Sequence, residues 1–231
     1  MASKPVWDIP TRLFHWLLVS LVALLWVSGE FGGLDISGTL PGLGQFYYSN
    51  MDIHALAGQG VFVLIIFRLF WGIWGSTTSR FSHFAYRPKA IQNEAKLLLK
   101  GQIPETTGHN PLGGLMVIVL IAVLLAQSLS GLFASDDLFY EAPLAGLVSS
   151  DNSKTITGWH HDLFGVLQAL IILHIAAVFY YLIRGKNLIK AMITGRNPAV
   201  DNQKLSIKPL WLGAVSLILA TTVLVLLRSV T

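Results

Sequence analysis

Five long apolar segments dominate this chain and restrict the folds open to it. They are Leu13–Gly29, Ala55–Trp74, Leu112–Phe133, Leu163–Ile183 and Leu210–Leu227. Each is close to the roughly 20 residues that a helix needs to cross a bilayer. Only 12% of the residues are charged and the mean hydropathy is +0.61, whereas a soluble domain carries about 25% charged residues. We therefore predict an all-α integral membrane protein, with five transmembrane helices in one membrane domain over residues 1–231. We expect the first span to be retained, because no small-residue cleavage site follows it.

The charges are distributed unequally between the connecting segments. Most Lys and Arg residues lie before the first span, between the second and third, and between the fourth and fifth. The opposite segments hold Glu30, Asp35, Asp52, Asp136, Asp137, Glu141, Asp151 and Asp162. This positive-inside pattern predicts a cytoplasmic N-terminus and a C-terminus on the other side. The isoelectric point near 9.4 then reflects topology and contact with anionic lipid, and we expect no nucleic-acid partner.

The absence of cysteine excludes several kinds of redox chemistry. With no Cys in 231 residues, the chain has no thiolate iron–sulfur cluster, no covalent haem attachment through cysteine and no disulfide. A redox cofactor in this protein would need other ligands, and histidine is the leading candidate.

Four histidines lie in or beside the apolar segments. His160 and His174 are fourteen residues apart, which is almost four helical turns and roughly 21 Å along the axis. We expect His160 to begin the fourth helix, just before its apolar segment, and His174 to lie about halfway along it. His15 and His54 lie near the starts of two other spans. The predicted topology places His54 at the depth of His160 on the outer side, and His15 at the depth of His174 on the inner side. Each pair could bind one iron from opposite faces of a porphyrin, an arrangement suited to electron transfer.

Other interpretations of the histidines remain open. His161 competes with His160, but its thirteen-residue spacing to His174 turns it about 140° around the helix, so we expect it to meet a propionate, a partner or water. A single histidine at a helix end is usually an interfacial or hydrogen-bonded residue. Four that pair by depth are harder to explain in that way, because ionisable groups in a membrane are costly. Zinc or copper is disfavoured because the two depths are too far apart for one metal site.

Several nearby residues fit a porphyrin as well. Gly58 lies one turn after the second-span histidine, where a side chain would block a flat ring, and Gly29 and Gly165 could serve in the same way. The alternative for these glycines is ordinary helix packing through small residues. Arg12 and Arg68 could each pair with a propionate of the inner haem, while the alternative for Arg68 is snorkelling to the cytoplasmic interface.

Five stretches carry a resemblance to a known family. They are Val6–Trp16, Arg68–Gly75, Gly108–Gly113, Gly131–Asp137, and His160-His161 followed by His174. Residues 6–196 resemble the bacterial di-haem cytochrome b561 family, particularly its branch related to the b-type cytochrome subunit of nickel–iron hydrogenases. The resemblance implies a four-helix transmembrane bundle holding two haem b groups, with His15, His54, His160 and His174 as ligands. It also implies quinone as a membrane redox partner. The last span, about residues 209–228, falls outside the four-helix core as an additional C-terminal transmembrane helix.

The resemblance and the histidine pattern together indicate a transmembrane electron carrier of the bacterial inner membrane. It would move electrons between the quinone pool and a periplasmic redox partner, either a c-type cytochrome or a dehydrogenase such as hydrogenase. The acidic outer segments suit a partner with a basic surface. One alternative is a superoxide oxidase that passes electrons to quinone, although acidic outer segments disfavour it. Another is a haem-free transporter, although the chain shows no internal repeat. Whether the chain is an enzyme, such as a quinone oxidoreductase, stays open.

Polar residues of the inner segments are the candidates for a quinone site. His83, Arg87, His109 and Asn110 are polar candidates on the inner side, where a histidine could exchange protons with quinone oxygens. His109 precedes a helix start, so the alternative is a capping or loop residue.

Overall fold

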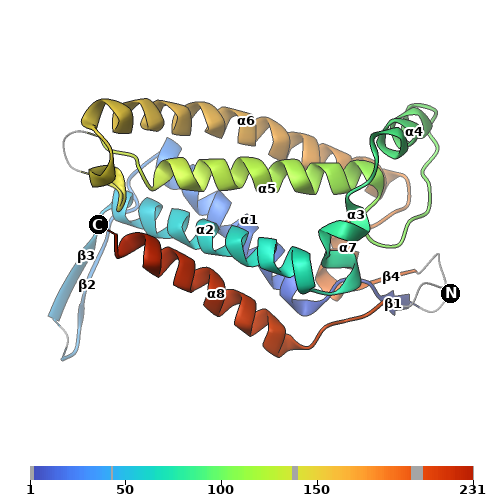
Figure 1. Ribbon diagram of the computed structural model, residues 1–231, viewed down its shortest axis with the longest axis horizontal. Coiled ribbons are helices and arrows are strands. Elements are labelled where there is room, and N and C mark those ends of the chain that lie inside the picture. Colours follow the sequence, from blue (N-terminus) through green and yellow to red (C-terminus); the bar gives the residue numbers. More distant parts are fainter. Residues whose placement is uncertain (1–2, 43, 137–139, 199–204, 231) are drawn as a thin grey trace.

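The computed structural model describes residues 3–42, 44–136, 140–198 and 205–230, and consists mainly of helices. Five of them are long and apolar enough to cross a membrane: α1 (Ile9–Glu30), α2 (Asn50–Trp74), α5 (Pro111–Gly131), α6 (Ser150–Ile183) and α8 (Leu210–Arg228). The five predicted spans are therefore confirmed, and the chain is an all-α membrane protein. Figure 1 shows the five helices side by side with their axes running between the two ends of the molecule.

Helix α6 begins thirteen residues before the predicted span. The sequence-based boundary at Leu163 marks where the apolar run starts, but the helix continues through a polar segment back to Ser150. Ser149 caps it by accepting a hydrogen bond from the Asn152 N–H. His160 consequently lies well inside the helix rather than at its start, and that expectation was wrong because hydropathy reports the membrane-embedded part of a helix only.

Local sequence signals begin the other spans. Asp8 caps α1 by accepting from the Thr11 N–H, with Pro10 in the first turn. Ser49 and Asp52 form a reciprocal capping box at the start of α2. Asn110 caps α5 by accepting from the Gly113 N–H. These caps satisfy backbone donors that would otherwise be unpaired near the membrane surface.

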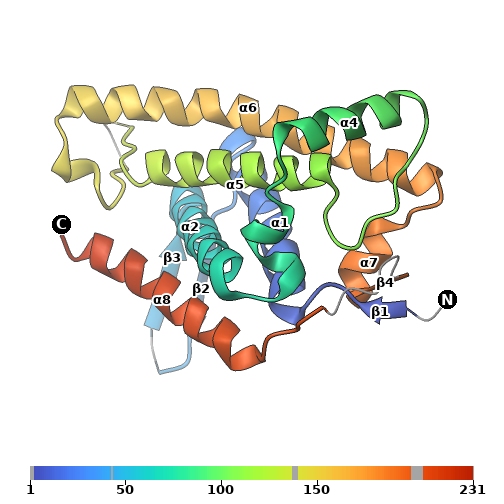
Figure 2. The same ribbon diagram turned by 45° about the vertical axis from the view of Figure 1, so that its right-hand side comes forward.

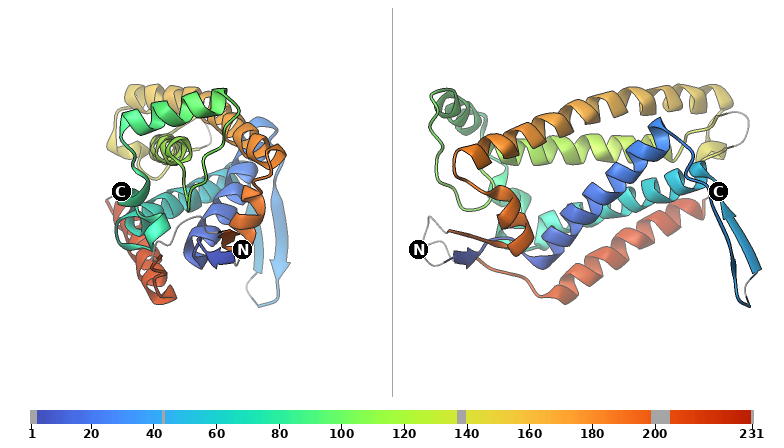
Figure 3. Two further views of the ribbon diagram at one scale, coloured as in Figure 1. Left: turned by 90° about the vertical axis from the view of Figure 1, so that its right-hand side faces the viewer. Right: turned by 180° about the vertical axis from the view of Figure 1, so that it is seen from behind.

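Helix α2 is the central helix of the bundle. It contacts α1, α5 and α8, while α6 packs on α5, and the views from the end and from behind show the same order (Figure 3). The buried α2 residues Val61, Ile65 and Trp71 belong to the largest apolar cluster. Helix α8 lies outside the other four, against α2, where the Trp74 indole N–H donates to the Ser216 hydroxyl at 3.0 Å.

The basic end of the molecule carries several short elements. They are β1 (Ser3–Pro5), η1 (Thr77–Ser79), α3 (Phe81–Phe84), α4 (Pro88–Leu99), α7 (Leu188–Thr194) and β4 (Arg196–Pro198). Strands β1 and β4 pair antiparallel, which ties the N-terminus to the segment after α7. Helix α4 lies beside the end of α5 (Figure 2), where Glu94 accepts a hydrogen bond from the Leu112 N–H at 2.9 Å.

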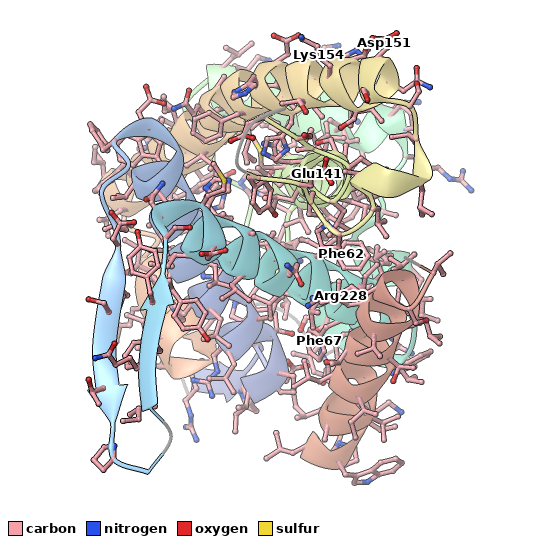
Figure 4. All side chains as sticks on the ribbon, turned by 90° about the vertical axis from the view of Figure 1, so that its left-hand side faces the viewer. Phe62, Phe67, Glu141, Asp151, Lys154 and Arg228 are labelled. Carbon is pink, nitrogen blue, oxygen red and sulfur yellow. The ribbon has the colours of Figure 1, made fainter. Side chains whose placement is uncertain are left out.

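The opposite end carries a hairpin that the sequence analysis did not foresee. Strands β2 (Ile36–Leu40) and β3 (Gly44–Tyr48) pair antiparallel in the segment between α1 and α2. A 3-10 turn, η2 (Ala145–Leu147), precedes α6 at this end. Figure 4 looks onto this end and labels Glu141, Asp151, Lys154 and Arg228, which carry charge there.

Candidate functional site

His54 on α2 and His160 on α6 face each other at the hairpin end of the bundle. Their ring centroids are 6.5 Å apart with the planes at 76°. Two collinear metal–imidazole bonds of about 2 Å, with about 1.1 Å from each nitrogen to its ring centre, require a centroid separation of about 6.2 Å. The pair is therefore already spaced for one metal ion between the two rings.

Ser28 and Gly29 of α1 support the His54 ring. The Ser28 hydroxyl lies 2.8 Å from His54 Nδ1 and donates its own proton to the Leu25 carbonyl at 3.2 Å. With the hydroxyl proton on the Leu25 carbonyl, Nδ1 donates to Ser28, and this is the tautomer that keeps the lone pair on Nε2. A Cβ placed on Gly29 would lie 3.2 Å from His54 Cε1, so the glycine gives the ring its room.

The same arrangement recurs on α5 around His160. Its Nδ1 lies 3.0 Å from both the Gln127 carbonyl and the Ser130 hydroxyl, and Ser130 donates to that carbonyl at 2.9 Å. Nδ1 is again the donor, and Nε2 is again the nitrogen with a lone pair. A Cβ on Gly131 would lie 3.0 Å from His160 Cε1. The Gln127 amide nitrogen lies 3.2 Å from His160 Nε2.

His161 takes a different position from its neighbour. Its side chain is exposed, and its ring centroid is 6.4 Å from that of His160. The structure thus brings the His160 ring into an edge-on ring contact with His54 at 6.5 Å, and the exposed His161 makes no such ring contact among the described residues.

His15 on α1 and His174 on α6 are the other two predicted ligands. The two imidazoles are close enough to interact electrostatically, and both are half-buried. Among the described residues neither has a hydrogen-bond partner, and His15 Nδ1 is buried in that state. Trp16 stands edge-on to the His15 ring at 5.0 Å.

The donor set at these positions fits a haem iron. His54 and His160 can each bind a metal through Nε2, where His160 accepts from the Gln127 amide, a contact that a metal would replace. Two glycines make the space that their rings occupy. The buried, unpartnered nitrogen of His15 marks a further place where the protein alone leaves a polar atom unsatisfied. Among the described residues no group of three or more His, Asp or Glu side chains could hold a metal ion.

The arginines predicted near the inner pair have contacts of their own. Arg68 is 2% exposed, which contradicts the snorkelling alternative. Its guanidinium lies over the rings of Phe81 and Phe84, at 5.0 and 5.7 Å, and its Nη1 has no partner among the described residues. Arg12 donates from Nη1 to the Ile193 carbonyl at 2.6 Å. Gly58 is not crowded, since a Cβ there would meet only Leu25 at 3.9 Å.

The four quinone candidates do not form one cluster of accessible groups. His109 packs between Trp7 and Phe84, and burial, reinforced by the nearby Arg68 charge, lowers its pKa to about 3. Asn110 caps α5 and donates to the Tyr181 hydroxyl. The structure favours the loop alternative for His109, because Asn110 is the capping residue and His109 is enclosed.

The remaining two candidates lie nearer the surface. Arg87 is exposed at the start of α4. Burial, and secondarily the charge of Arg80, lowers the pKa of His83. Neither residue touches the inner histidine pair through a described hydrogen bond.

Sequence reasoning missed the polar residues that hold the outer histidines. Gln127, Ser130 and Gly131 were not singled out, and Ser28 was passed over although Gly29 was noted. A signal was present, because the dipeptide Ser-Gly occurs near the outer end of both the first and the third span.

The five spans and the contact between His54 and His160 define the class of protein, a multi-pass helical membrane protein with neighbouring imidazoles inside its bundle. The chain belongs to the prokaryotic cytochrome b561 family, whose model matches residues 6–195. It is thus a membrane b-type cytochrome of a hydrogenase-associated family and a protein of electron transfer. The recognition made from sequence motifs is confirmed.

The similar proteins are named as hydrogenase components. The chain is 28% identical to a probable nickel–iron hydrogenase B-type cytochrome subunit of Azotobacter vinelandii, over 82% of this chain and 86% of that protein. It is 27% identical to the corresponding subunit of Rhizobium leguminosarum bv. viciae, over 87% and 91%. It is 26% identical to a probable nickel–iron hydrogenase 1 B-type cytochrome subunit of Escherichia coli K12, over 76% and 82%. No solved structure matches the chain.

Proposed function

We propose that this protein is a di-haem b-type cytochrome that moves electrons between the membrane quinone pool and a redox protein at the outer face. The observation that carries the proposal is the outer pair, where His54 and His160 stand 6.5 Å apart with both Nδ1 atoms donating elsewhere. A bound haem supplies a one-electron couple, and two histidine ligands leave its iron no open position for oxygen.

The second haem is assigned to His15 and His174. These residues lie on α1 and α6 and interact electrostatically. Fourteen residues of α6 separate His174 from His160, so the two sites lie at different depths, roughly 21 Å apart along the helix. A carrier that spans a membrane needs two such depths, because one haem alone reaches only one side.

The orientation follows from the charges. We place the N-terminus and the basic end in the cytoplasm of a bacterium, with the protein in its inner membrane. His54 and His160 then face the periplasmic side, together with the C-terminus. The quinone exchanges electrons near the inner pair.

A hydrogenase is the outer partner that the similar proteins support best, since three of them are named as subunits of nickel–iron hydrogenases. The acidic residues of the outer segments would complement a basic surface on such a partner, and a c-type cytochrome with a basic face meets the same condition. Copurification with a large subunit from native membranes would favour the hydrogenase.

Haem content of purified variants tests the proposal. We expect a pyridine haemochrome assay to give two haem b per chain in the wild type and one in each of His15→Ala, His54→Ala, His160→Ala and His174→Ala. His161→Ala is the matched control, because it removes an adjacent imidazole of the same helix, and it should keep both haems. A wild type without haem after expression with ample haem would refute electron transfer by these histidines. Loss of a haem in His161→Ala but not in His160→Ala would reverse the ligand assignment.

A further inference from the structure

Two Ser-Gly dipeptides occupy equivalent places beside the outer histidines. Ser28-Gly29 of α1 lies against His54, and Ser130-Gly131 of α5 lies against His160. The serine oxygens are 2.8 and 3.0 Å from the ring Nδ1 atoms. Both serine protons go to backbone carbonyls of the same helices. Each ring is therefore held from the side opposite its partner by the same pair of residues.

This arrangement affects how strongly the rings donate electrons. An imidazole that donates a hydrogen bond from Nδ1 becomes a more basic ligand through Nε2. A more basic axial ligand stabilises ferric over ferrous iron and lowers the reduction potential of a haem. His160 has two acceptors for its Nδ1 proton, the Gln127 carbonyl and Ser130, whereas His54 has Ser28 among the described residues.

The inner pair lacks this support. Among the described residues neither His15 nor His174 has a hydrogen-bond partner, and the buried Nδ1 of His15 is unpaired.

We propose that Ser28, Ser130 and the Gln127 carbonyl make the outer histidine pair the low-potential site of the protein. The inference rests on the proposed function, because it assumes one haem at each pair. At each site one electron converts ferric to ferrous haem and no covalent bond changes. Reduction of one quinone to quinol takes two electrons, one from each of two equivalents of a one-electron reductant that is oxidised at the outer face, and two protons from the surrounding water. A lower outer potential favours electron entry from that reductant.

Spectroelectrochemical titration of the haem-loaded protein tests this inference. We expect two one-electron waves in the wild type, and His54→Ala should remove the lower one. Ser28→Ala should move the lower wave upward by about 59 mV, equivalent to a tenfold change in the ratio of ferric to ferrous haem affinity. Ser130→Ala should move it less, because the Gln127 carbonyl still accepts from His160. Ser28→Thr keeps the hydroxyl and should restore the wild-type value.

Ser128→Ala is the matched control. Ser128 and Ser130 are both 9% exposed, and Ser128 donates to the Leu125 carbonyl at 3.2 Å in the same way, without contacting a histidine. It should leave both waves in place. If Ser28→Ala fails to load haem, the nearly isosteric Ser28→Cys, a weaker acceptor, should shift the lower wave upward by less.

Two results would overturn the inference. One is that His54→Ala removes the upper of the two wild-type waves instead of the lower one. The other is that the potential of the lower wave in Ser28→Ala equals that in Ser128→Ala within error. Both leave the haem assignment intact. If His54→Ala and His160→Ala instead keep two haems, the ligand assignment fails and the inference falls with it.

Discussion

Gly131→Ala should weaken binding of the haem proposed between His54 and His160, because the added Cβ overlaps the His160 ring by a few tenths of an ångström. The added Cβ would lie 3.0 Å from His160 Cε1 and 3.4 Å from Nδ1, whereas ordinary contacts begin at 3.4 Å. The ring must therefore move by about 0.4 Å, against the hydrogen bonds of its Nδ1. Overpacking of this kind costs about 1–3 kcal/mol, which corresponds to roughly 5- to 150-fold weaker haem binding.

The rate of haem transfer to an excess of a haem-binding scavenger protein measures this loss. In Gly131→Ala we expect one haem to leave faster by the stated factor and the other to leave at the wild-type rate. Gly60→Ala is the control, because its Cβ would lie 3.1 Å from a methyl of Leu21 and meets no histidine. Equal transfer rates for Gly131→Ala, Gly60→Ala and the wild type would refute the reasoning that the glycine makes room for a ligand ring.

Two further predictions concern the basic end of the molecule. Asp8→Ala removes an acceptor used by the Thr11 N–H, the Trp71 indole and the Ser79 hydroxyl. It should lower the free energy of unfolding, measured by denaturation in detergent, by roughly 2–4 kcal/mol. A change below about 1 kcal/mol would contradict this prediction. His109 has its pKa lowered to about 3 by burial, so the unfolded chain binds its proton first as pH falls below about 6.5. Above that pH, His109 does not reduce the free energy of unfolding. Below it, the free energy of unfolding falls by about 1.4 kcal/mol per pH unit, down to the folded pKa. His109→Gln should remove that part of the pH dependence in melting experiments between pH 7.5 and 5, and an unchanged slope would show that His109 titrates normally.

The spans could be predicted because their signal is local. A run of apolar residues long enough for a bilayer identifies a helix whatever it packs against. The start of α6 could not be predicted in that way, because Ser150 to Asp162 are polar yet helical. The pairing of β1 with β4 brings together residues about 190 positions apart, and no local pattern announces such a contact.

The candidate site could also be predicted only in part. Helical spacing and topology identified His54 and His160 as partners, because period and depth can be counted along the chain. Their hydrogen-bond partners depend on how α1 and α5 are rotated about their axes, which hydropathy does not encode. Arg68 shows another difficulty, since its place near a span end left snorkelling to the interface open as an alternative, whereas the side chain is buried with its guanidinium over the Phe81 ring of α3.

The spacing of His160 and His174 has an electrical consequence. Fourteen helical residues rise roughly 21 Å, about seven-tenths of a 30 Å hydrocarbon core. Moving one elementary charge across the whole membrane costs about 2.3 kcal/mol per 100 mV, so an electron passing between the two depths crosses a voltage worth about 1.6 kcal/mol. In the proposed orientation, with the cytoplasm negative, an inward electron works against that voltage and needs about 70 mV of potential difference between the two proposed haems for each 100 mV across the membrane. The fourteen residues between the two histidines therefore determine how much of the membrane voltage each transferred electron helps to build.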